Sequence, residues 1–593
     1  MKKVLCILLA AVMLLMVGCN STQKPEETTT TAEETKAEEK KEEVKTEETA
    51  KEEAPAEETV EEPAEFDEAA WLPISDTNET LSLGISQHAS IPDYDNHELT
   101  KWLEETSGVN LEFVYFTGTS KEIQQQVALM VAGGETLPDI LFGLNLPTEF
   151  VNELGRDGYL VELSDMVGTE LTPYMNQHYA ELSEDVLERE SVAVPDPLDG
   201  ARYRVPMIQD VQSSSSVQSA VYINQKWLDN LELKEPTNIQ ELYDVLVAFR
   251  DQDPNGNGKK DEIPMIGDLS DSGDFILGYI INAYVYYNVD EDYHLNATDG
   301  KLWAPWTTEE YREALKTLHQ WQAEGLIEPH CFTGISASDV KPIYTPEDQV
   351  AVAGVISGTL SSNMVKDNPI IFEYTVLDYI ADGETDKGGY LVVNPTVVGT
   401  TSMMITADCK NPELAMKFID FIHKDEAVAS FRHGIQGVNW DWADPEQKDR
   451  TAANIAILDD GQAFFEGIYT WRRNVGGVAT PNNYSKVAAG DTEWLAYEKE
   501  MGDYYVKEMY PNARYPEEVV TAFALTSEES EYYKSVYVLL NDYIKESLAK
   551  FGTGVWDPNS DADWETYLSE LESIGLSKYL EVCQAAYTRL KSK

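Results

Sequence analysis

The sequence predicts an α/β protein built around a largely parallel sheet. Between residues 81 and 142, strand-like segments alternate with helix-like segments at short intervals, a pattern typical of parallel strands joined by right-handed crossovers. Residues 71–593 are also long enough for more than one domain, and the chain is 42% hydrophobic although a polar segment dilutes that figure. The chain can therefore bury a sizeable core.

The first residues predict an export signal. Lys2 and Lys3 precede an apolar run, Val4–Val17, which has the length of a signal peptide and is too short for an ordinary membrane span. The run ends in Met16-Val17-Gly18-Cys19, which resembles the lipobox of bacterial lipoproteins, although Leu is usual where Met16 stands. The resemblance implies cleavage before Cys19 and a diacylglycerol anchor on the Cys19 sulfur. Palmitate would be among the acyl chains of the lipoprotein. Ordinary secretion with an incidental cysteine is the alternative.

An acidic low-complexity segment follows. Residues 20–70 hold 19 acidic residues and six lysines, a net charge of −13. Such a segment cannot bury enough apolar surface to fold, and its like charges extend it. We expect residues 20–74 to be a disordered tether that lifts the globular part off the membrane. A glycosylated stalk is an alternative without specific support.

The globular part is itself strongly acidic. Removing the tether and the two N-terminal lysines from the whole-chain net charge of −62 leaves −51. This charge argues against nucleic acid as a partner. Cys331, Cys409 and Cys583 are an odd number of widely spaced thiols, so the sequence does not predict a disulfide framework.

The α/β alternation suggests where a ligand would bind. We expect strands at 81–85, 109–116 and 137–142 and helices at 96–105 and 120–132. In parallel sheets, ligands lie beyond the carboxyl ends of the strands. The candidate ligand residues in the loops after these strands are Gln87, His88, Thr117, Gly118 and Gly143 to Asn145. A plain connecting loop is the alternative at each place.

The next segment leads from a hinge to an oxygen-rich loop. Residues 199–206, which include Tyr203, look like an extended hinge strand before the serine run 213–216. A T-x-x-Q capping box at 237–240 then opens an amphipathic helix that ends near residue 250.

The loop after this helix predicts a Ca²⁺ site. Residues 251–262 carry side-chain oxygens at alternate positions around two glycines, and Ca²⁺ prefers six to eight oxygen ligands. A register that starts at Asp251 matches the EF-hand pattern. We prefer the register that starts at Asp253, because it uses both late acids. Its ligands are Asp253, Asn255, Asn257, the Lys259 carbonyl, Asp261 and Glu262. A solvated Gly/Asn turn is the alternative.

Residues 224–237, the helix and the loop together resemble the extracellular solute-binding lipoproteins of carbohydrate ABC transporters. The similarity is to the large oligosaccharide-binding branch with a structural Ca²⁺ site. Further matching segments, in family order, are 127–140, 158–163, 411–421 and 434–440. The resemblance implies two α/β lobes, periplasmic-binding-protein-like, that close on ligand about hinge strands, with additional C-terminal helices. It places lobe one at 75–205 and 396–435, and lobe two at 206–395 and 436–593.

The implied activity is transport rather than catalysis. The protein would capture a carbohydrate, an oligosaccharide by the branch it resembles, and deliver it as a monomer to permease subunits. Sugars are recognised by flat aromatic faces and by carboxylate, amide and Arg groups. The aromatic and cationic candidates are Tyr203, Trp303, Trp440, Trp471 and Arg473. Trp440, which follows a glycine-flanked turn, is the preferred stacking residue. Each Trp has core packing as its alternative, and Arg473 could equally pair with a surface acid.

Two other classes stay open. A secreted glycoside hydrolase needs only two carboxylates, which this acidic chain could supply. The sequence contains no G-x-S-x-G or H-E-x-x-H motif and no His/Cys zinc cluster. A sugar-binding subunit of a membrane sensor would use the same two lobes.

Overall fold

The computed structural model describes residues 66–592 except for several internal segments. The gaps are 88–90, 92, 210–219, 268–274, 288–294, 335–341, 345, 359–367, 383–396, 443–454 and 459–522, within which only 478–479, 497, 500–501, 504, 508–509, 514, 518 and 520 are described. Within this described part, no helix is both long enough and apolar enough to cross a membrane.

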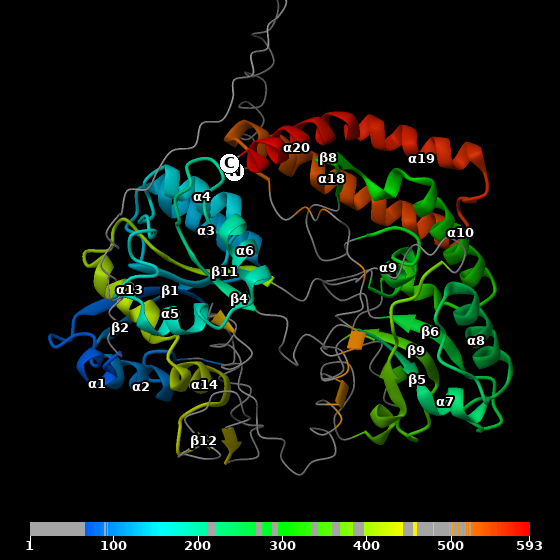
Figure 1. Ribbon diagram of the computed structural model, residues 1–593, viewed down its shortest axis with the longest axis horizontal. Helices are drawn as coiled ribbons and strands as arrows, with labels where there is room; N and C mark the ends of the chain where they lie inside the picture. The colour runs from blue at the N-terminus through cyan, green and yellow to red at the C-terminus, as the bar shows by residue number, and fades with distance from the viewer. Residues whose placement is uncertain are drawn as a thin grey trace, which may run out of the picture. The chain divides into compact units, whose positions relative to one another are not determined.

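The described chain contains two main sheets (Figure 1). The first has six strands in the order β14-β4-β11-β3-β1-β2, and all are parallel to one another except β11. Its strands are β1 (Thr80–Ser86), β2 (Asn110–Phe116), β3 (Ile140–Asn145), β4 (Val205–Gln209), β11 (Val397–Ile405) and β14 (Val478–Ala479). The strands expected at 81–85 and 109–116 are confirmed. The third begins at Ile140 rather than at Leu137, because Asp139 accepts hydrogen bonds from Ser82 before the ladder starts.

Helices cover both faces of this sheet. One face packs Leu83, Ile85 and Phe142 against α2, α5, α13 and α14. The opposite face packs Leu141 and Leu144 against α3 and α4. The helices of this part are α1 (Glu68–Trp71), α2 (Glu98–Ser107), α3 (Ser120–Gly133), α4 (Thr148–Arg156), α5 (Pro173–Tyr179), α6 (Glu184–Ala193), α13 (Pro412–Phe421) and α14 (Asp425–His433). Alternate residues of each strand thus feed separate cores, as expected for a sheet buried on both sides.

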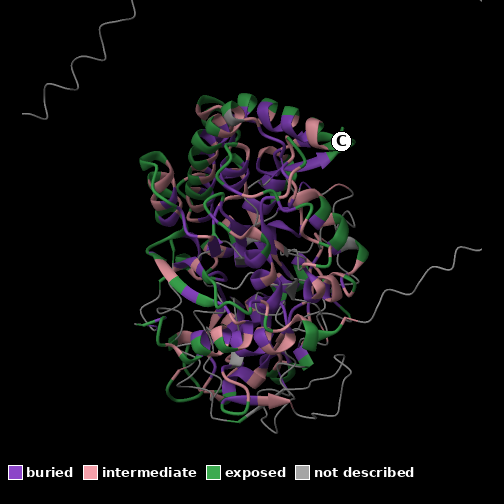
Figure 2. Ribbon diagram, turned by 90° about the vertical axis from the view of Figure 1, so that its left-hand side faces the viewer, coloured by how far each residue is buried: buried purple, intermediate pink, exposed green. Residues whose placement is uncertain are grey.

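The second sheet has four strands in the order β10-β5-β9-β6. Its strands are β5 (Ala220–Asn224), β6 (Ile263–Gly267), β9 (Ala353–Gly358) and β10 (Tyr374–Val376). The strands β6, β9 and β10 run in one direction, and β5 runs against them. A large core surrounds this sheet, and Figure 2 shows buried residues concentrated along the strands and the inner faces of the helices.

Seven longer helices share the core of the second sheet. They are α7 (Gln225–Asn230), α8 (Ile239–Asp251), α9 (Phe275–Ile281), α10 (Glu309–Ala323), α18 (Ser527–Gly552), α19 (Asp561–Ile574) and α20 (Leu576–Lys591). Smaller elements are the hairpin β7 (Asn296–Thr298) and β8 (Lys301–Trp303), the hairpin β12 (Trp440–Trp442) and β13 (Ile455–Ile457), and the 3-10 turns η2 (Pro305–Thr307), η3 (Pro329–Phe332) and η4 (Pro369–Glu373).

The helix starts show how local chemistry sets the elements. Asn411 caps α13 with Pro412 in its first turn, as the sequence predicts. The capping box expected at Thr237 is shifted by one residue. Asn238 caps α8 by accepting from the Glu241 N–H, and the Glu241 carboxylate accepts from the Thr237 N–H at 2.9 Å. Asn is as favourable as Thr at the N-cap position, because its side-chain oxygen can accept from the third helical N–H.

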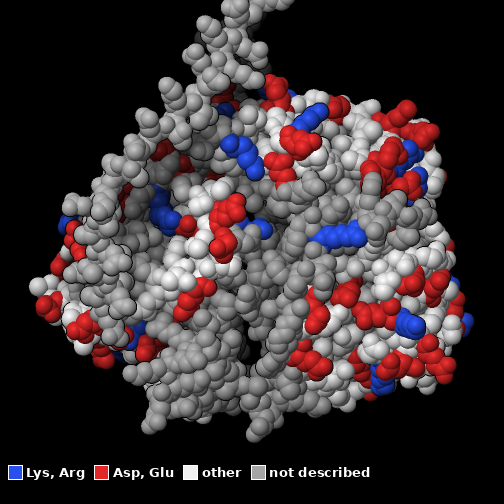
Figure 3. Space-filling view, in the orientation of Figure 1, with Lys and Arg blue, Asp and Glu red and all other residues white. Residues whose placement is uncertain are grey.

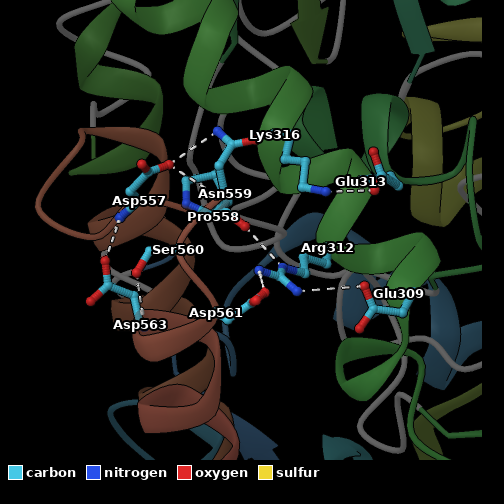
Figure 4. A network of polar contacts seen from close by, with 10 residues as sticks. All are labelled: Glu309, Arg312, Glu313, Lys316, Asp557, Pro558, Asn559, Ser560, Asp561 and Asp563. Atoms are coloured by element: carbon cyan, nitrogen blue, oxygen red, sulfur yellow. Dashed lines mark hydrogen bonds and ion pairs between the residues drawn. The ribbon is translucent and has the colours of Figure 1, made fainter.

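A buried arginine joins the C-terminal helices to α10 (Figure 4). Arg312 Nε donates to the Pro558 carbonyl at 2.9 Å, and its Nη2 donates to Asp561 Oδ1 at 2.8 Å. Its guanidinium carbon also lies 5.6 Å from the centre of the Trp564 ring. These contacts fix the turn between α18 and α19 on the core of the second sheet, where the sequence had expected C-terminal helices.

Two segments differ from the lobe boundaries drawn on the sequence. Residues 436–593 were all expected in lobe two, but Val478–Ala479 pairs with β4 in the first sheet. Trp440 likewise packs against Ala429 of α14, a helix of the first sheet. A two-residue strand carries no sequence signal of its own, so its partner is decided only by tertiary contacts. The disordered tether expected over residues 20–74 also needs correction, because residues 66–74 belong to the folded part, where α1 forms and Leu72 and Ile74 pack against the first core. The remaining boundaries stay predictions.

Candidate ligand-binding and metal sites

The carboxyl ends of the parallel strands define one edge of the first sheet. The strands β1, β2 and β3 end at Ser86, Phe116 and Asn145, and the parallel strand β4 ends at Gln209. The antiparallel β11 begins at this edge, since Thr401 pairs with Asn145. Loops that follow these strands are where α/β sheets bind ligands.

The second sheet has a corresponding edge. The strands β6, β9 and β10 end there, and β5 begins there, since Ala220 pairs with Gly358. Residues 210–219 connect β4 to β5, and residues 377–396 connect β10 to β11. Both connections therefore join the carboxyl edge of one sheet to the carboxyl edge of the other. This is the connectivity expected of two lobes that bind a ligand between their carboxyl edges.

A polar cluster lies just beyond β10 at the second edge. Asp378 Oδ1 accepts from Tyr504 Oη at 2.9 Å, and the Asp378 N–H donates to Glu235 Oε1 at 3.4 Å. Tyr279 Oη donates to the Asp378 carbonyl. Burial raises the pKa of the Glu235 carboxyl, and the nearby Asp378 charge raises it further. Carboxylates and phenols of this kind can accept from and donate to sugar hydroxyls. Sequence patterns missed this cluster because its members come from distant segments.

Three of the predicted ligand residues lie at the first edge. Gln87 is exposed directly after β1, and its N–H donates to the Phe116 carbonyl at 2.8 Å. Asn145 is exposed at the end of β3, whereas Gly143 is buried within that strand and adopts a φ of 63°. His88, Trp471 and Arg473 lie outside the described residues. The binding role of Gln87 and Asn145 stays a prediction that their position supports.

Trp440 does not have the open ring face that stacking on sugar requires. Its side chain is 0% exposed, and its Nε1 donates to the Gly434 carbonyl at 2.7 Å. One neighbour is Ala429, and the Trp442 ring meets it edge-on with centroids 5.1 Å apart. In this structure Trp440 is therefore a packing residue, which corrects the preferred stacking assignment. Its glycine-flanked position could not reveal the helix that covers it.

Tyr203 also needs correction. It precedes β4 and so lies at the amino end of that strand, away from the carboxyl edge. Its ring is buried against Gly155 of α4, and its Oη donates to Asp199 Oδ2 at 2.8 Å. Trp303 is half-buried at the end of β8, where its Nε1 donates to Thr298 Oγ1 at 3.0 Å. That hairpin contacts α20, and its link to a ligand stays untested.

The oxygen-rich loop connects α8 to β6 and folds back on its own backbone. Asp253, Gly256 and Gly258 all have positive φ, at 50°, 69° and 73°. The Asp253 carboxylate accepts from the Gly258 N–H at 3.1 Å, and Asn257 Oδ1 accepts from the Lys259 N–H at 2.7 Å. These contacts keep the side-chain oxygens gathered around the loop. The left-handed turns favour glycine, which explains its two positions.

One oxygen of this loop marks it as a candidate cation site. Glu262 Oε1 is buried and makes no hydrogen bond within the described structure. Burial raises the pKa of Glu262, and the nearby Asp261 and Asp253 charges raise it further. Among the described residues, no group of three or more His, Cys, Asp or Glu side chains is arranged as a metal site. The proposed donor set differs from such a group because it also uses two amides and a backbone carbonyl, which suits Ca²⁺.

The structure distinguishes the two registers of the loop. Asp251, the first ligand of the alternative register, is the last residue of α8, and both of its oxygens accept from Arg250 at 2.8 Å. The loop ends at Ile263, the amino end of β6, so it lies at the opposite end of that strand from the carboxyl edge. A cation there would stiffen the sheet without contacting a ligand at the other end.

Residues 88–429 match the model of the family described as bacterial extracellular solute-binding protein. The chain belongs to this family. The resemblance recognised in the sequence is thereby confirmed, together with the α/β fold class. Membership accounts for the two sheets and for the chain connections between their carboxyl edges.

Individual relatives cover most of the chain. The fructooligosaccharide ABC transporter substrate-binding protein FusA of Streptococcus pneumoniae is 25% identical over 543 residues, covering 88% of this chain and 93% of FusA. The polygalacturonan/rhamnogalacturonan-binding protein YtcQ of Bacillus subtilis is 22% identical over 432 residues, covering 70% of this chain and 80% of YtcQ.

Solved structures show the same fold. An EF-hand mutant of FusA in complex with fructo-nystose has a TM-score of 0.63 at 24% identity. The match covers 87% of this chain and 100% of the FusA chain. A solute-binding protein from Bifidobacterium longum infantis, described as binding HMO, has a TM-score of 0.67 at 18% identity, with 87% and 99% covered. At these identities the structural likeness supports the fold alone.

Proposed function

We propose that this protein captures an oligosaccharide outside the cytoplasm and delivers it to the permease subunits of an ABC transporter. The observation that carries the proposal is the pair of carboxyl edges joined by two chain connections in a member of this family. Ligand contacts with both edges would favour a closed form, because only that form uses them all. The names of FusA and YtcQ, which refer to fructooligosaccharide and to polygalacturonan/rhamnogalacturonan, support a carbohydrate ligand.

The proposal includes attachment to the outer face of the cell membrane. A lipid at Cys19 would anchor the chain, and the acidic segment that precedes the folded part at Phe66 would hold the globular part in reach of the permease. The acidic groups on the described part of the face in Figure 3 agree with a protein that works away from nucleic acid. We propose that it acts as a monomer and without enzymatic activity.

Ca²⁺ is the proposed structural cofactor. The donors would be Asp253, Asn255, Asn257, the Lys259 carbonyl, Asp261 and Glu262, as the preferred register has them. The orphaned Glu262 oxygen and the carboxylate–amide donor set support this assignment, and the EF-hand named for FusA is consistent with it. When bound, the cation would supply positive charge to a cluster of carboxylates, and it would supply no reaction chemistry.

The other two classes predict different results. A hydrolase would cleave its sugar, and a sensor subunit would bind it without a permease. No described observation favours the hydrolase or the sensor subunit over the transport function.

A calorimetric binding experiment tests the proposal. The chain from residue 20 onward is titrated with kestose, maltotriose, xylotriose and trigalacturonate, and each sugar is then recovered and analysed by chromatography. We expect binding of at least one sugar, recovered intact. Cleaved sugar would support the hydrolase instead, and no binding of any sugar would contradict the proposed carbohydrate ligand.

A further inference from the structure

Three aromatic rings gather near the end of β2. Phe113 and Tyr115 project from the same side of the strand, with nearly parallel rings whose centroids lie 6.3 Å apart. Tyr94 packs against both, at centroid distances of 5.7 and 5.6 Å. Tyr94 is fully buried, whereas Tyr115 is 37% exposed. The buried rings therefore fix the position of one ring that remains accessible.

This exposed ring lies at the carboxyl edge of the first sheet. Tyr115 pairs with Ile85, one residue before the end of β1, and Phe116 beside it accepts from the Gln87 N–H. Tyr94 comes from the connection between β1 and α2, which also starts at that edge. Tyr115 thus lies where a ligand of this fold would approach, although its alternation with Phe113 reads in the sequence as an ordinary strand.

Two carboxylates belong to the same connection as Tyr94. Asp93 and Asp95 lie on either side of Tyr94, and their charges, after the larger effect of burial, raise the pKa of the Tyr115 hydroxyl. Asp93 accepts from the Asn96 N–H at 3.1 Å and from Asn96 Nδ2 at 2.8 Å, which holds the connection in place. Lys101 of α2 offsets part of this charge at Asp93. The connection that carries Tyr94 is therefore acidic, and a side-chain pair within it helps to hold its backbone.

We propose that Tyr115 is a stacking residue for a ring of a neutral oligosaccharide, with Asp95 accepting from the hydroxyls of that sugar. The proposal rests on the proposed function and names the substrate class of that site. An aromatic face suits the C–H patch of a sugar ring, and a carboxylate suits its hydroxyls. A uronate would bring its own negative charge to Asp93 and Asp95, which like-charge repulsion opposes. The described residues of the second edge add the carboxylates of Asp378 and Glu235.

The test uses two tyrosines of equal exposure at opposite ends of one sheet. Tyr159 is 38% exposed, and its carbonyl accepts from the Ala407 N–H just after β11, at the amino edge. Y115A, Y115W and Y159A are titrated calorimetrically with kestose, maltotriose, xylotriose and trigalacturonate. Melting temperatures show that each variant is folded.

We expect wild type to prefer a neutral sugar. Y115A should raise its Kd about tenfold, which corresponds to the loss of one stacked ring. Y115W should stay within a few-fold of wild type because it keeps an aromatic face, and Y159A should not change the Kd. D95N should also weaken the neutral sugar, since an amide is a poorer acceptor than a carboxylate.

Each other outcome overturns a defined part of the inference. Unchanged affinity of Y115A for a neutral sugar that wild type binds removes the stacking role and leaves the proposed function intact. An equal loss in Y159A shows that the effect is not local to the edge. Preference for trigalacturonate overturns the neutral class. If wild type binds none of the four sugars, the proposed function itself fails, and this inference falls with it.

Discussion

The Ca²⁺ assignment makes a prediction that the loop geometry sharpens. At pH 8 without the cation, Glu262 is a partly buried carboxylate with an unpaired oxygen near Asp253 and Asp261. Its raised pKa means that the folded state holds this charge less readily than the unfolded state does, so this group lowers stability as the pH rises through its folded pKa. A bound cation would remove this loss of folding stability.

The expected magnitude follows from linkage. A cation at 100 times its Kd that binds only the folded state adds about 2.7 kcal/mol to the free energy of unfolding. If the domain around the second sheet melts as a unit, this raises its Tm by about 5–10 °C. Differential scanning calorimetry of the chain in EDTA and in excess Ca²⁺ measures the shift.

Two variants separate the site from its surroundings. E262Q should lose most of the Ca²⁺ response and should melt in EDTA at or above wild type, because the amide removes the buried charge. D251N should keep the full response, because Arg250 already occupies the Asp251 carboxylate. The reasoning is refuted if wild type melts identically in EDTA and Ca²⁺, or if E262Q responds like wild type. Loss of the response in D251N would instead support the alternative register.

Three further predictions concern stability. Replacing Arg312 by Ala should lower the free energy of unfolding, measured by urea titration, by roughly 2–4 kcal/mol. The variant loses two charge-assisted hydrogen bonds and leaves the Pro558 carbonyl without its donor (Figure 4). A decrease of less than about 0.5 kcal/mol would contradict this role of Arg312. Asp420 is buried, and burial raises its pKa to about 7, so its ionisation should cost up to about 4 kcal/mol between pH 4 and pH 8. D420N should therefore flatten the loss of stability over that range, and an unchanged pH profile would contradict this. Gly155→Ala should lower the melting temperature measured by calorimetry, because the new Cβ would lie 2.3 Å from the Tyr203 ring. Gly133→Ala should leave the melting temperature unchanged or raise it, because no contacting atom lies closer than 3.6 Å to its new Cβ.

Local pattern was enough for much of the fold. Alternation placed β1 and β2, and Asn411 with Pro412 placed the start of α13, because these features depend on neighbours in the sequence. The register of the oxygen-rich loop stays a prediction, although its candidate ligands are close in the sequence. What failed depended on distant contacts.

Trp440 shows why the ligand site was harder to predict. Its sequence context, a glycine turn followed by alternating residues, is the same whether the ring faces solvent or Ala429 of α14. The role proposed for Tyr115 shows the converse, because a tyrosine in a strand is expected in the core until the strand is known to end one residue later. The Asp378 cluster joins four segments that no motif connects.

The two ends of the second sheet suggest why the metal loop and the ligand site can coexist in one lobe. The loop enters β6 at Ile263, and the carboxyl edge lies five residues further, after Gly267. Because strand residues advance about 3.3 Å each, the two sites are separated by more than 10 Å along the strand. At that distance, through a sheet buried by helices, the proposed cation would stabilise the fold around the second sheet without contacting the proposed sugar site. Stability and specificity are then set by different residues, which leaves the ligand edge free to vary while the loop keeps its oxygens.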